Sequence, residues 1–527
     1  MLQTNPTPPM SATAGWSGAL RAFVHPRVVT MLFLGFSAGL PILLIFSSLS
    51  LWLREAGVER AAVTFFSWAA LGYSFKFVWA PLVDRLRLPW LTRYLGRRRG
   101  WLLFAQAAVM ASMAAMASVD PAAGQTQLVW MACAAVALGF SSATQDIVID
   151  AYRIESAPDA LQAMMSSTYI AGYRIGMLVA GAGALYLADG FGSSADAYSY
   201  VAWRNTYLLM ALTMLVGVIT TLVIAEPETR GGGAANKDTS HVRLLVVFAA
   251  AVAALIGVYA WSGGLATSAK SGLVELFSNK VLAGLLVETL RLASAVVAAA
   301  LVARVLVAAN VVAASVVDET YVQPVAEFFK RQGWSLAVLL LAIIGLYRIA
   351  DIVLGVVSNV FYQDLGFSKS EIATAVKTFG LFMTIGGGFL GGLLAVRYGV
   401  IRILLLGAIL AAATNLLFMA LAELGYHMTW LYVVVAADNL SAGLASAAFV
   451  AFLSSLTNIS FTAMQYALFS SLMTLIPKVL GGYSGAIVDT VGYPTFFLMT
   501  ALMGVPVIIL IMWAARRFEL KEPQIQT

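Results

Sequence analysis

Residues 80–85 read APLVDR and residues 96–99 read GRRR, and residues 392–399 repeat this order of small, apolar and basic residues as GLLAVRYG. Each loop follows the second apolar segment in a group of six, so the same feature stands at the same place in two parts of the chain. Such a repeat indicates two six-helix halves related by an axis along the membrane normal. The expected fold class is therefore an all-α integral membrane protein.

The apolar segments around these loops are long enough to cross a bilayer. The hydrocarbon core is about 30 Å thick and needs about 20 apolar residues in a helix. The 527 residues are 61% hydrophobic and only 11% charged, whereas a soluble domain carries about 25% charged residues. We predict twelve core spans, at 27–53, 61–84, 100–118, 126–153, 161–188, 203–225, 335–363, 371–396, 400–422, 429–456, 462–488 and 493–517.

The composition also excludes several classes of protein. High hydrophobicity excludes a disordered chain, and scarce charge excludes nucleic-acid binding as the meaning of the +6 net charge. Cys133 is the single cysteine and cannot form an internal disulfide, and the three histidines are too scattered for a zinc site. An ATP-binding loop is missing, because Ala269 stands where the nearest candidate needs its second Gly. We expect no enzyme activity, no cofactor and no metal.

A long connection joins the two groups of spans. It carries two further apolar runs, near 242–263 and 281–317, the second interrupted by Glu288, Arg291 and Arg304. We interpret 292–317 as the membrane part of the second run, with an interfacial helix leading in, which gives fourteen spans; the alternative is one amphipathic hairpin on the membrane surface. The predicted parts are a cytoplasmic leader (1–26), a six-helix bundle (27–228), the connection (229–334), a second bundle (335–517) and a cytoplasmic tail (518–527).

The distribution of Lys and Arg predicts the orientation. Connections on the face of the amino terminus contain 19 of these residues, and connections on the opposite face contain six. Because cytoplasmic loops are enriched in Lys and Arg, we expect both termini to be cytoplasmic.

Seven basic residues remain within the spans, where a charge costs at least ~2.5–3.5 kcal/mol and usually faces a cavity or a partner. Four of them lie deep in the predicted core, and so do four acids. This balance predicts paired charges around one polar cavity, formed by Lys76, Arg174, Arg348, Lys377, Asp146, Asp150, Asp351 and Asp438.

Asp146 and Asp150 are four residues apart and so share one helix face. Two carboxylates so placed repel each other, which raises the proton affinity of at least one. This is the chemistry that a proton-coupled carrier requires, with Arg174 as the expected counter-charge. Arg348 and Asp351 form a second predicted pair. The alternative is that all these residues are salt bridges that only hold helices together.

Aromatic residues accompany the predicted site. Tyr73 precedes Lys76, Tyr173 precedes Arg174 and Tyr347 precedes Arg348. A tyrosine offers a flat apolar face with a polar tip, which suits a sugar ring. We therefore include the three tyrosines among the predicted substrate-binding residues.

The quoted loops also predict a gate. A carboxylate at a helix end, such as Asp84, can pair with an Arg of the neighbouring half in one state and release it in another. The first loop keeps both members in Asp84 and Arg85, whereas the second has Val396 in place of the acid before Arg397. Residues 97–99 are weaker candidates for the same role, and the alternative is that the basic loops only fix the topology.

Small residues at a spacing of four, as in Gly35 and Gly39 or Gly172 and Gly176, let helix backbones approach closely. The run from Gly386 to Gly392 has the same property. Helices that slide in a transporter need such faces, but so does static packing.

Both loops resemble the loop signature of the major facilitator superfamily, with Ala80 in place of its Gly and a lengthened basic stretch in the first copy. Further motifs resemble the AmpG muropeptide permeases within that superfamily, over roughly 25–228 and 320–517. These motifs are LGFSAGLP (34–41), FKF (75–77), GRRRGW (96–101), SATQDI (142–147), GYRIGM (172–177), KTFG (377–380), Asn439 with AFVA (448–451), and QYAL (465–468).

The resemblance implies a major facilitator fold that imports N-acetylglucosaminyl-1,6-anhydro-N-acetylmuramyl peptides across the bacterial inner membrane. It also implies drive by the proton gradient, a place in peptidoglycan recycling and a link to β-lactamase induction. Gln145, Asp146, Arg174 and Lys377 match family positions, and Asp438, next to Asn439, stands where other members have Glu. The insertion at 235–318 is a departure from shorter members. We expect a monomer in contact with membrane lipid.

Two alternatives remain open at this point. A carrier of acetyl-CoA or another anionic metabolite would also use a basic cavity, since sister families share the fold. A membrane enzyme or sensor that binds muropeptides without moving them is the other.

Overall fold

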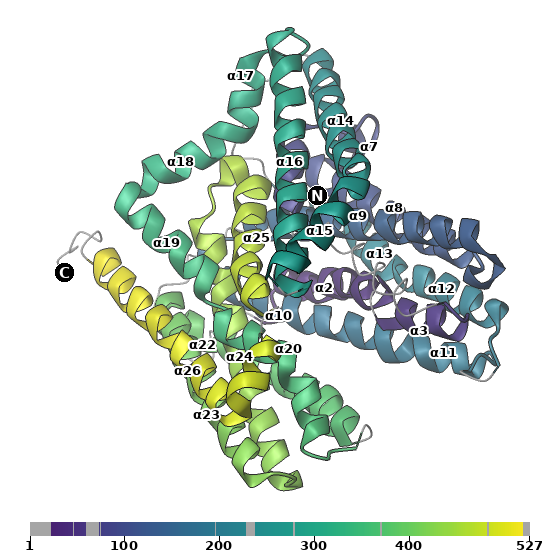
Figure 1. Ribbon diagram of the computed structural model, residues 1–527. Coiled ribbons are helices and arrows are strands. Elements are labelled where there is room, and N and C mark those ends of the chain that lie inside the picture. Colours follow the sequence, from purple (N-terminus) through teal and green to yellow (C-terminus); the bar gives the residue numbers. More distant parts are fainter. Residues whose placement is uncertain are drawn as a thin grey trace. The chain divides into compact units, whose positions relative to one another are not determined.

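The computed structural model describes residues 23–45, 47–58, 73, 75–194, 197–227, 238–277, 280–368, 371–481 and 484–519. Within these ranges the regular secondary structure is helical and contains no strand (Figure 1). The chain divides into two compact units. Unit 1 comprises Met1–Arg230 with Arg331–Thr527, and unit 2 comprises Gly231–Lys330.

The first half of unit 1 consists of long helices joined by short ones. Two interruptions bear on function: a 3-10 turn, η2, carries Lys76, and a π-helical turn, η4, follows Arg174. The described elements are α2 (Pro26–Ile45), α3 (Ser47–Glu55), η2 (Lys76–Val78), α6 (Ala80–Arg85), α7 (Leu91–Leu95), α8 (Arg97–Ala117), η3 (Pro121–Ala123), α9 (Gln125–Ser156), α10 (Asp159–Leu178), η4 (Val179–Gly183), α11 (Ala184–Gly190), α12 (Tyr200–Thr213) and α13 (Leu215–Val223).

The second half of unit 1 has similar interruptions. A π-helical segment, η6, carries Lys377, and the last long helix is kinked at Gly492, whose φ is 77°. The described elements are α19 (Trp334–Leu346), α20 (Ile349–Asp364), η6 (Ile372–Phe379), α22 (Gly380–Tyr398), α23 (Val400–Leu424), α24 (Met428–Leu456), η7 (Ile459–Phe461), α25 (Thr462–Gly481) and α26 (Ser484–Glu519).

Unit 2 is built on a helical hairpin. Helix α14 packs along α16, and the shorter α15 also contacts α16. The elements are α14 (Asp238–Trp261), α15 (Gly263–Phe277), α16 (Lys280–Ala308), α17 (Ala314–Val317), η5 (Asp318–Val322) and α18 (Gln323–Gln332), whose last two residues belong to unit 1.

The prediction for the second apolar run was wrong in detail. Helix α16 is continuous from Lys280 to Ala308, so the chain does not break between an interfacial helix and a span at 292. The reason is Arg291, whose guanidinium donates to the Tyr259 carbonyl at 2.6 and 3.0 Å and lies 3.9 Å from the Tyr259 ring centroid. Because this charge is met by the end of α14, it does not interrupt the helix. The helix ends before the expected residue 317, at a turn in which Asn310 has a positive φ of 57°.

Twelve helices in the described part of the chain are long and apolar enough to cross a membrane. Five lie in each half of unit 1, and two, Arg243–Trp261 and Leu290–Ala308, lie in unit 2. The predicted span 61–84 falls largely outside the described residues. Helix α25 occupies the predicted span 462–488 but is too polar to be one of the twelve. The protein is thus an all-helical, multi-pass membrane protein.

Glycines bring α2 and α10 into backbone contact, as the four-residue spacing predicts. A Cβ atom on Gly35 would meet the Tyr169 carbonyl, and one on Gly172 would meet the Leu32 carbonyl. No side chain therefore separates the two helices at these points. This contact fixes the helix that carries Tyr173 and Arg174.

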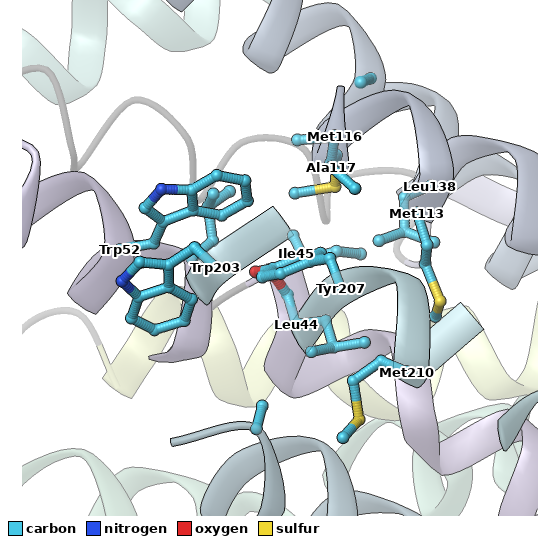
Figure 2. Packing of buried hydrophobic residues seen from close by; sticks show 14 of the residues in the cluster. Leu44, Ile45, Trp52, Met113, Met116, Ala117, Leu138, Trp203, Tyr207 and Met210 are labelled. Carbon is cyan, nitrogen blue, oxygen red and sulfur yellow. The ribbon is translucent and has the colours of Figure 1, made fainter. Parts of the chain in front are cut away.

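An aromatic core holds the other end of the first half (Figure 2). The Trp52 and Trp203 rings are stacked with centroids 5.7 Å apart, and Tyr207 lies 4.8 Å from Trp52. The Tyr207 hydroxyl donates to the Leu44 carbonyl at 2.8 Å, so this buried polar tip is satisfied. These contacts tie α2, α3 and α12 together.

The adjacent pair Gly386 and Gly387 offers a matched test of helix packing. A methyl on Gly387 would collide with the Leu440 carbonyl of α24, whereas a methyl on Gly386 would meet nothing within 4 Å. We expect Gly387→Ala to destabilise the protein by ~1–3 kcal/mol through overpacking, and Gly386→Ala to be nearly neutral. Thermal unfolding in detergent measures both. Equal unfolding temperatures for the two variants would contradict the close approach of α22 and α24.

Candidate functional site

Four charged residues of the first half form a buried cluster. Asp150 of α9 lies between two bases: its Oδ2 is 3.6 Å from Lys76 Nζ, and its Oδ1 is 3.3 Å from Arg153 Nη2. Asp146 lies one turn earlier on the same helix face, and Lys76 and Asp150 are the charged groups that act on it. Arg153 is fully buried, and the other three are at most 7% exposed. The cluster is electrically balanced when both acids are ionised.

Asp146 of this cluster and its neighbour Gln145 have unused hydrogen-bonding capacity. Asp146 Oδ1 and both amide atoms of Gln145 are buried and have no hydrogen-bond partner among the described residues. Most buried polar atoms in proteins are bonded. Gln145 and Asp146 are therefore the strongest candidates of the first half for contact with a proton or a polar substrate.

The expectation that Arg174 is the counter-charge of Asp146 and Asp150 was wrong. The charged group that acts on Arg174 is Arg348, from the second half, and the neighbouring Tyr173 is a neutral phenol. The reason is that η2 brings Lys76, and the following turn of α9 brings Arg153, directly to Asp150. Arg174 has no hydrogen bond or ion pair within the described residues, so its charge is left for another group.

The second half has its own charge cluster. Arg348 lies where the chain leaves α19 and before α20 begins, and its Nε is 3.5 Å from Asp351 Oδ2, which confirms the predicted pair. Its Nη1 donates to Ser446 Oγ at 3.1 Å. Asp438 accepts from Thr414 Oγ1 at 3.5 Å, and Asp351 and Arg348 act on it electrostatically. One base here faces two acids.

The predicted aromatic residues occupy different environments. Tyr73 is half-buried and its hydroxyl bonds to Ser142 Oγ. Tyr173 is also half-buried, with its ring 6.0 Å from that of Tyr169. Tyr347, by contrast, is 6% exposed, stacks on Phe449 at 4.4 Å and donates to the Leu404 carbonyl at 3.1 Å. Its expected role as a sugar-stacking face is corrected by this packing, because the ring is already used to join α19, α23 and α24.

The two remaining predicted site residues of the second half lie near the junction of η6 and α22. Asn439 accepts from Thr384 Oγ1 at 2.9 Å and donates to the Val435 carbonyl at 3.0 Å, so most of its capacity is used. Lys377 is exposed and sits in a π-helical segment. Such segments are frequent at functional sites.

At the predicted cytoplasmic end, Asp84 joins the two halves. Its carboxylate accepts from the backbone N–H groups of Ala463 at 3.2 Å and Met464 at 3.0 Å, in the first turn of α25. It also pairs with Arg98 of its own half at 2.7 Å. A carboxylate at a helix N-terminus satisfies unpaired donors and interacts favourably with the helix dipole. Asp84 therefore caps a helix of the opposite half.

This arrangement corrects the expected latch. The basic partner of Asp84 is Arg98 of the same half, and the link across the halves is made to backbone amides instead of an Arg side chain. Arg85 is half-buried beside it. Arg397, in the second copy of the loop, lies 5.6 Å from the Tyr398 ring and has a buried Nε without a hydrogen-bond partner in the described structure.

Sequence reasoning missed three residues of this network. Glu155 binds Arg98 through both of its carboxylate oxygens, and Glu226 accepts from the N–H groups of Arg98 at 2.8 Å and Arg99 at 3.0 Å, capping α8. Arg153, the third, is one of the 19 basic residues that we assigned to connections on the face of the amino terminus. The available signal is that all three lie at or just beyond the ends of the predicted spans 126–153 and 203–225.

Small apolar residues complete the closed contact at this end. Ala163 of α10 packs with Ala395, Ala448 and Ala451 of the second half. A Cβ atom on Gly392 would collide with Ser167 of the first half. Ile403 and Leu444 belong to the same cluster, so the two halves touch here through both small and larger apolar side chains.

Comparisons with known proteins agree with this fold. The Major Facilitator Superfamily model matches residues 339–526, and the Acetyl-coenzyme A transporter 1 model matches residues 27–224. The anhydromuropeptide permease of Escherichia coli (strain K12) is 30% identical over 501 residues, which cover 95% of this chain and 82% of that protein. The putative transporter AmpG 4 of Rickettsia felis is 28% identical over 497 residues, covering 94% of this chain and 98% of its own.

Solved structures share the fold at low sequence identity. The proton:xylose symporter XylE bound to 6-bromo-6-deoxy-D-glucose has a TM-score of 0.56 at 13% identity, over 95% of this chain and 96% of its own. The Escherichia coli fucose:proton symporter FucP has a TM-score of 0.54 at 11% identity, over 94% and 99%.

The gate contact can be tested by thiol labelling. In a Cys133→Ser background, Ala163→Cys places a thiol at a position that is 2% exposed and covered by the second half. Asp84→Ala removes the cap of α25, a loss of ~1.4 kcal/mol within the usual range for caps. We expect the labelling rate to rise about tenfold.

Asp120→Ala is the control, because Asp120 accepts from Ala122 N–H at 3.0 Å and so caps η3, at the other end of α8. It should leave the labelling rate unchanged. An equal rise in both variants would mean general loosening instead of gate opening.

Proposed function

The chain belongs to the AmpG muropeptide permease family of the major facilitator superfamily, and from this premise we propose that it imports anhydro-muropeptides by proton symport. The proposed substrates are N-acetylglucosaminyl-1,6-anhydro-N-acetylmuramyl peptides, carried from the periplasm to the cytoplasm across the bacterial inner membrane. This uptake serves peptidoglycan recycling and supplies the cytosolic signal for β-lactamase induction. The protein moves its substrate without converting it chemically.

The observation that carries the proposal is the buried cluster of the first half. Asp146 lies next to Asp150, has an unbonded carboxylate oxygen within the described structure, and is 7% exposed. Burial and a neighbouring acid both favour the protonated form of a carboxyl group. Asp146 and Asp150 are therefore the proposed proton-coupling residues, with Lys76 as the base that responds to their charge.

The substrate site is proposed to lie between the two halves. The charge of Arg348 bears on Arg174 from the opposite half, and two guanidinium groups repel unless an anion lies between them. The carboxylates of the muropeptide stem are suitable anions, because a guanidinium binds a carboxylate through two parallel hydrogen bonds. The other proposed contacts are made by Tyr73, Lys76, Gln145, Tyr173, Asp351, Lys377, Asp438 and Asn439.

The proposed topology has fourteen spans, twelve in the two bundles and two in the connection, with both termini in the cytoplasm. The described span candidates support it: five in each bundle and two in unit 2. The gate of Asp84, Arg85 and Arg397 then lies at the cytoplasmic surface. We further propose that one chain, surrounded by lipid, is sufficient for transport.

The driving force is adequate for accumulation. Moving one charge through 100 mV contributes about 2.3 kcal/mol, and each 1.4 kcal/mol is a factor of ten in concentration. One proton per substrate therefore supports a gradient of roughly fifty-fold.

A second candidate function is transport of acetyl-CoA or a similar anionic metabolite. It is favoured by the match of residues 27–224 to the Acetyl-coenzyme A transporter 1 model, and by the pair Arg174 and Arg348, which also suits phosphates. The longer similarity to an anhydromuropeptide permease favours the first function.

Uptake by proteoliposomes separates the two functions. With an inwardly directed proton gradient, radiolabelled anhydro-muropeptide should accumulate, unlabelled disaccharide should compete, and CoA should not. A protonophore should abolish accumulation. If the protein binds anhydro-muropeptide without accumulating it, the protein is a sensor and not a transporter. If CoA competes for uptake and the disaccharide does not, the second function is favoured.

Asp146→Asn should abolish accumulation against a gradient, because an amide cannot take up and release a proton. Membrane insertion and monodispersity should be unchanged. Asp189→Asn, at an exposed position on α11 of the same half, is the matched control and should transport normally. Normal accumulation by the Asp146→Asn variant would exclude that carboxylate as the coupling group.

Arg174→Gln should weaken uptake of the peptide-bearing substrate selectively. Losing a charge-assisted pair costs about 1.5–3 kcal/mol, which corresponds to a rise in KM of about 10–100-fold. The KM for the peptide-free anhydro-disaccharide, which lacks the stem carboxylates, should change little. An equal loss for both substrates would contradict the role of Arg174 in recognising the peptide.

A further inference from the structure

Arg153, a member of the buried cluster, makes side-chain contacts with both halves. In its own half it donates to Asp150 at 3.3 Å and to Gln162 at 3.2 Å. In the second half it donates to Ser454 Oγ of α24 at 2.6 Å, and its guanidinium lies 5.1 Å from the Tyr466 ring of α25. Its side chain is fully buried.

Among the described residues, the charge of Arg153 is met by one carboxylate only. Gln162, Ser166, Ser454 and Tyr466 are neutral, so Asp150 alone carries the opposite charge there, and Asp150 is shared with Lys76 at 3.6 Å. An arginine does not lose its proton in proteins. Removing the partner of a buried charge is strongly destabilising because the remaining charge is left in a medium of low dielectric constant.

The groups that face Asp150 come from several elements. Lys76 belongs to η2, Asp146 and Arg153 to α9, Tyr169 to α10, and Tyr466 to α25. The two tyrosines are uncharged phenols, so the ionisable acids of the set are Asp146 and Asp150. Of these, only Asp150 contacts Arg153 in the described structure.

We propose that Arg153 is a positioning residue that couples the charge of Asp150 to closure of the cytoplasmic gate. This inference rests on the proposed proton symport and deepens it. While Asp150 is negative, Arg153 stays buried and holds α9 against α24 and α25. When Asp150 takes up a proton, the guanidinium keeps its charge without a counter-charge. The guanidinium is more stable in water than in the interior without a counter-charge. Because the second half covers it, reaching water requires that half to move away.

The direction of this coupling fits import. A symporter that carries substrate inward must open to the cytoplasm after the proton has bound. In the proposed device, protonation of Asp150 weakens the contact between the halves at the predicted cytoplasmic end. Release of the proton to the cytoplasm restores the pair and closes that end.

A merely structural role for Arg153 makes a different prediction. Asp150 and Ser454 lie on different halves, and each contacts Arg153. If Arg153 only fills space, substitutions at Asp150 and Ser454 act independently. If Arg153 couples them, their effects depend on each other, and the dependence requires the arginine.

The experiment is a double-mutant cycle in the full-length protein, with the labelling rate of Ala163→Cys in the Cys133→Ser background as the measure of gate opening. Asp150→Asn mimics protonation and should raise the rate about tenfold, a typical size for coupling between sites. Ser454→Ala should raise it less. The combined variant should fall well short of the product of the two effects.

The same cycle is repeated with Arg153→Gln and with Arg153→Lys. Glutamine removes the charge, and lysine keeps the charge but lacks the planar guanidinium that bonds two partners at once. In either background, the effects of Asp150→Asn and Ser454→Ala on the labelling rate should therefore be independent. Because only the thiolate reacts, each rate is divided by the labelling rate of the exposed Cys133 in the natural protein at the same pH. Lowering the pH should raise this relative rate in the parent protein and in Asp146→Asn, but not in Asp150→Asn.

Independent effects in the Arg153 protein would overturn the inference, and so would coupling that persists in Arg153→Lys. A pH response that survives in Asp150→Asn and is lost in Asp146→Asn would overturn it as well. Muropeptide uptake by the parent protein is measured in the same liposomes. Failure of uptake would refute the proposed symport, whereas normal uptake with an additive cycle would refute only the role of Arg153.

Discussion

The structure of this protein depends on the cost of placing charge in a low-dielectric interior. An ionised side chain at the bilayer centre costs several kcal/mol. Each charged residue in the interior is therefore expected to have an oppositely charged partner or a functional role. The first half meets this requirement with Lys76 and Arg153 on either side of Asp150. The second half meets it with Arg348 and Asp351, beside Asp438. Beside these two clusters, the described structure leaves three groups available for a proton or a substrate: the carboxylate of Asp146, the amide of Gln145 and the guanidinium of Arg174.

The same constraint links the buried site to the gate. Helix α9 carries Asp146, Asp150 and Arg153 on one face and Glu155 at its end. Asp150 therefore belongs to the proposed proton site, and Glu155 to the network that positions Asp84 through Arg98. Asp84 in turn caps α25, which presents Tyr466 to Arg153. A change of charge at Asp150, near the C-terminal end of α9, is thus one helical turn from a contact with the other half.

Much of this organisation could be predicted from the sequence, and the misses have physical causes. The spans, the repeated loops, the glycine contacts and the pair Arg348 and Asp351 follow from hydropathy and helical spacing, which are local properties. Arg153 looked like a residue of a connection, because a basic residue at a helix end usually reaches water. Only its contacts with Ser454 of α24 and Tyr466 of α25 show that it points inward. Arg174 was assigned the wrong partner for the same reason, since the turn that delivers Lys76 to Asp150 is a tertiary feature. Tyr347 and Arg291 show the converse. Tyr347 was expected to bind a sugar and Arg291 to interrupt a helix, but both side chains hold helices together.

The central claim is that muropeptide and protons move together. The most direct measurement is the external pH of a suspension of proteoliposomes, followed without any imposed gradient after anhydro-muropeptide is added outside. The account predicts that substrate entry takes protons with it, so the external medium becomes alkaline in proportion to the muropeptide taken up, and that Asp146→Asn abolishes this change. Entry of muropeptide with no change in external pH would contradict it.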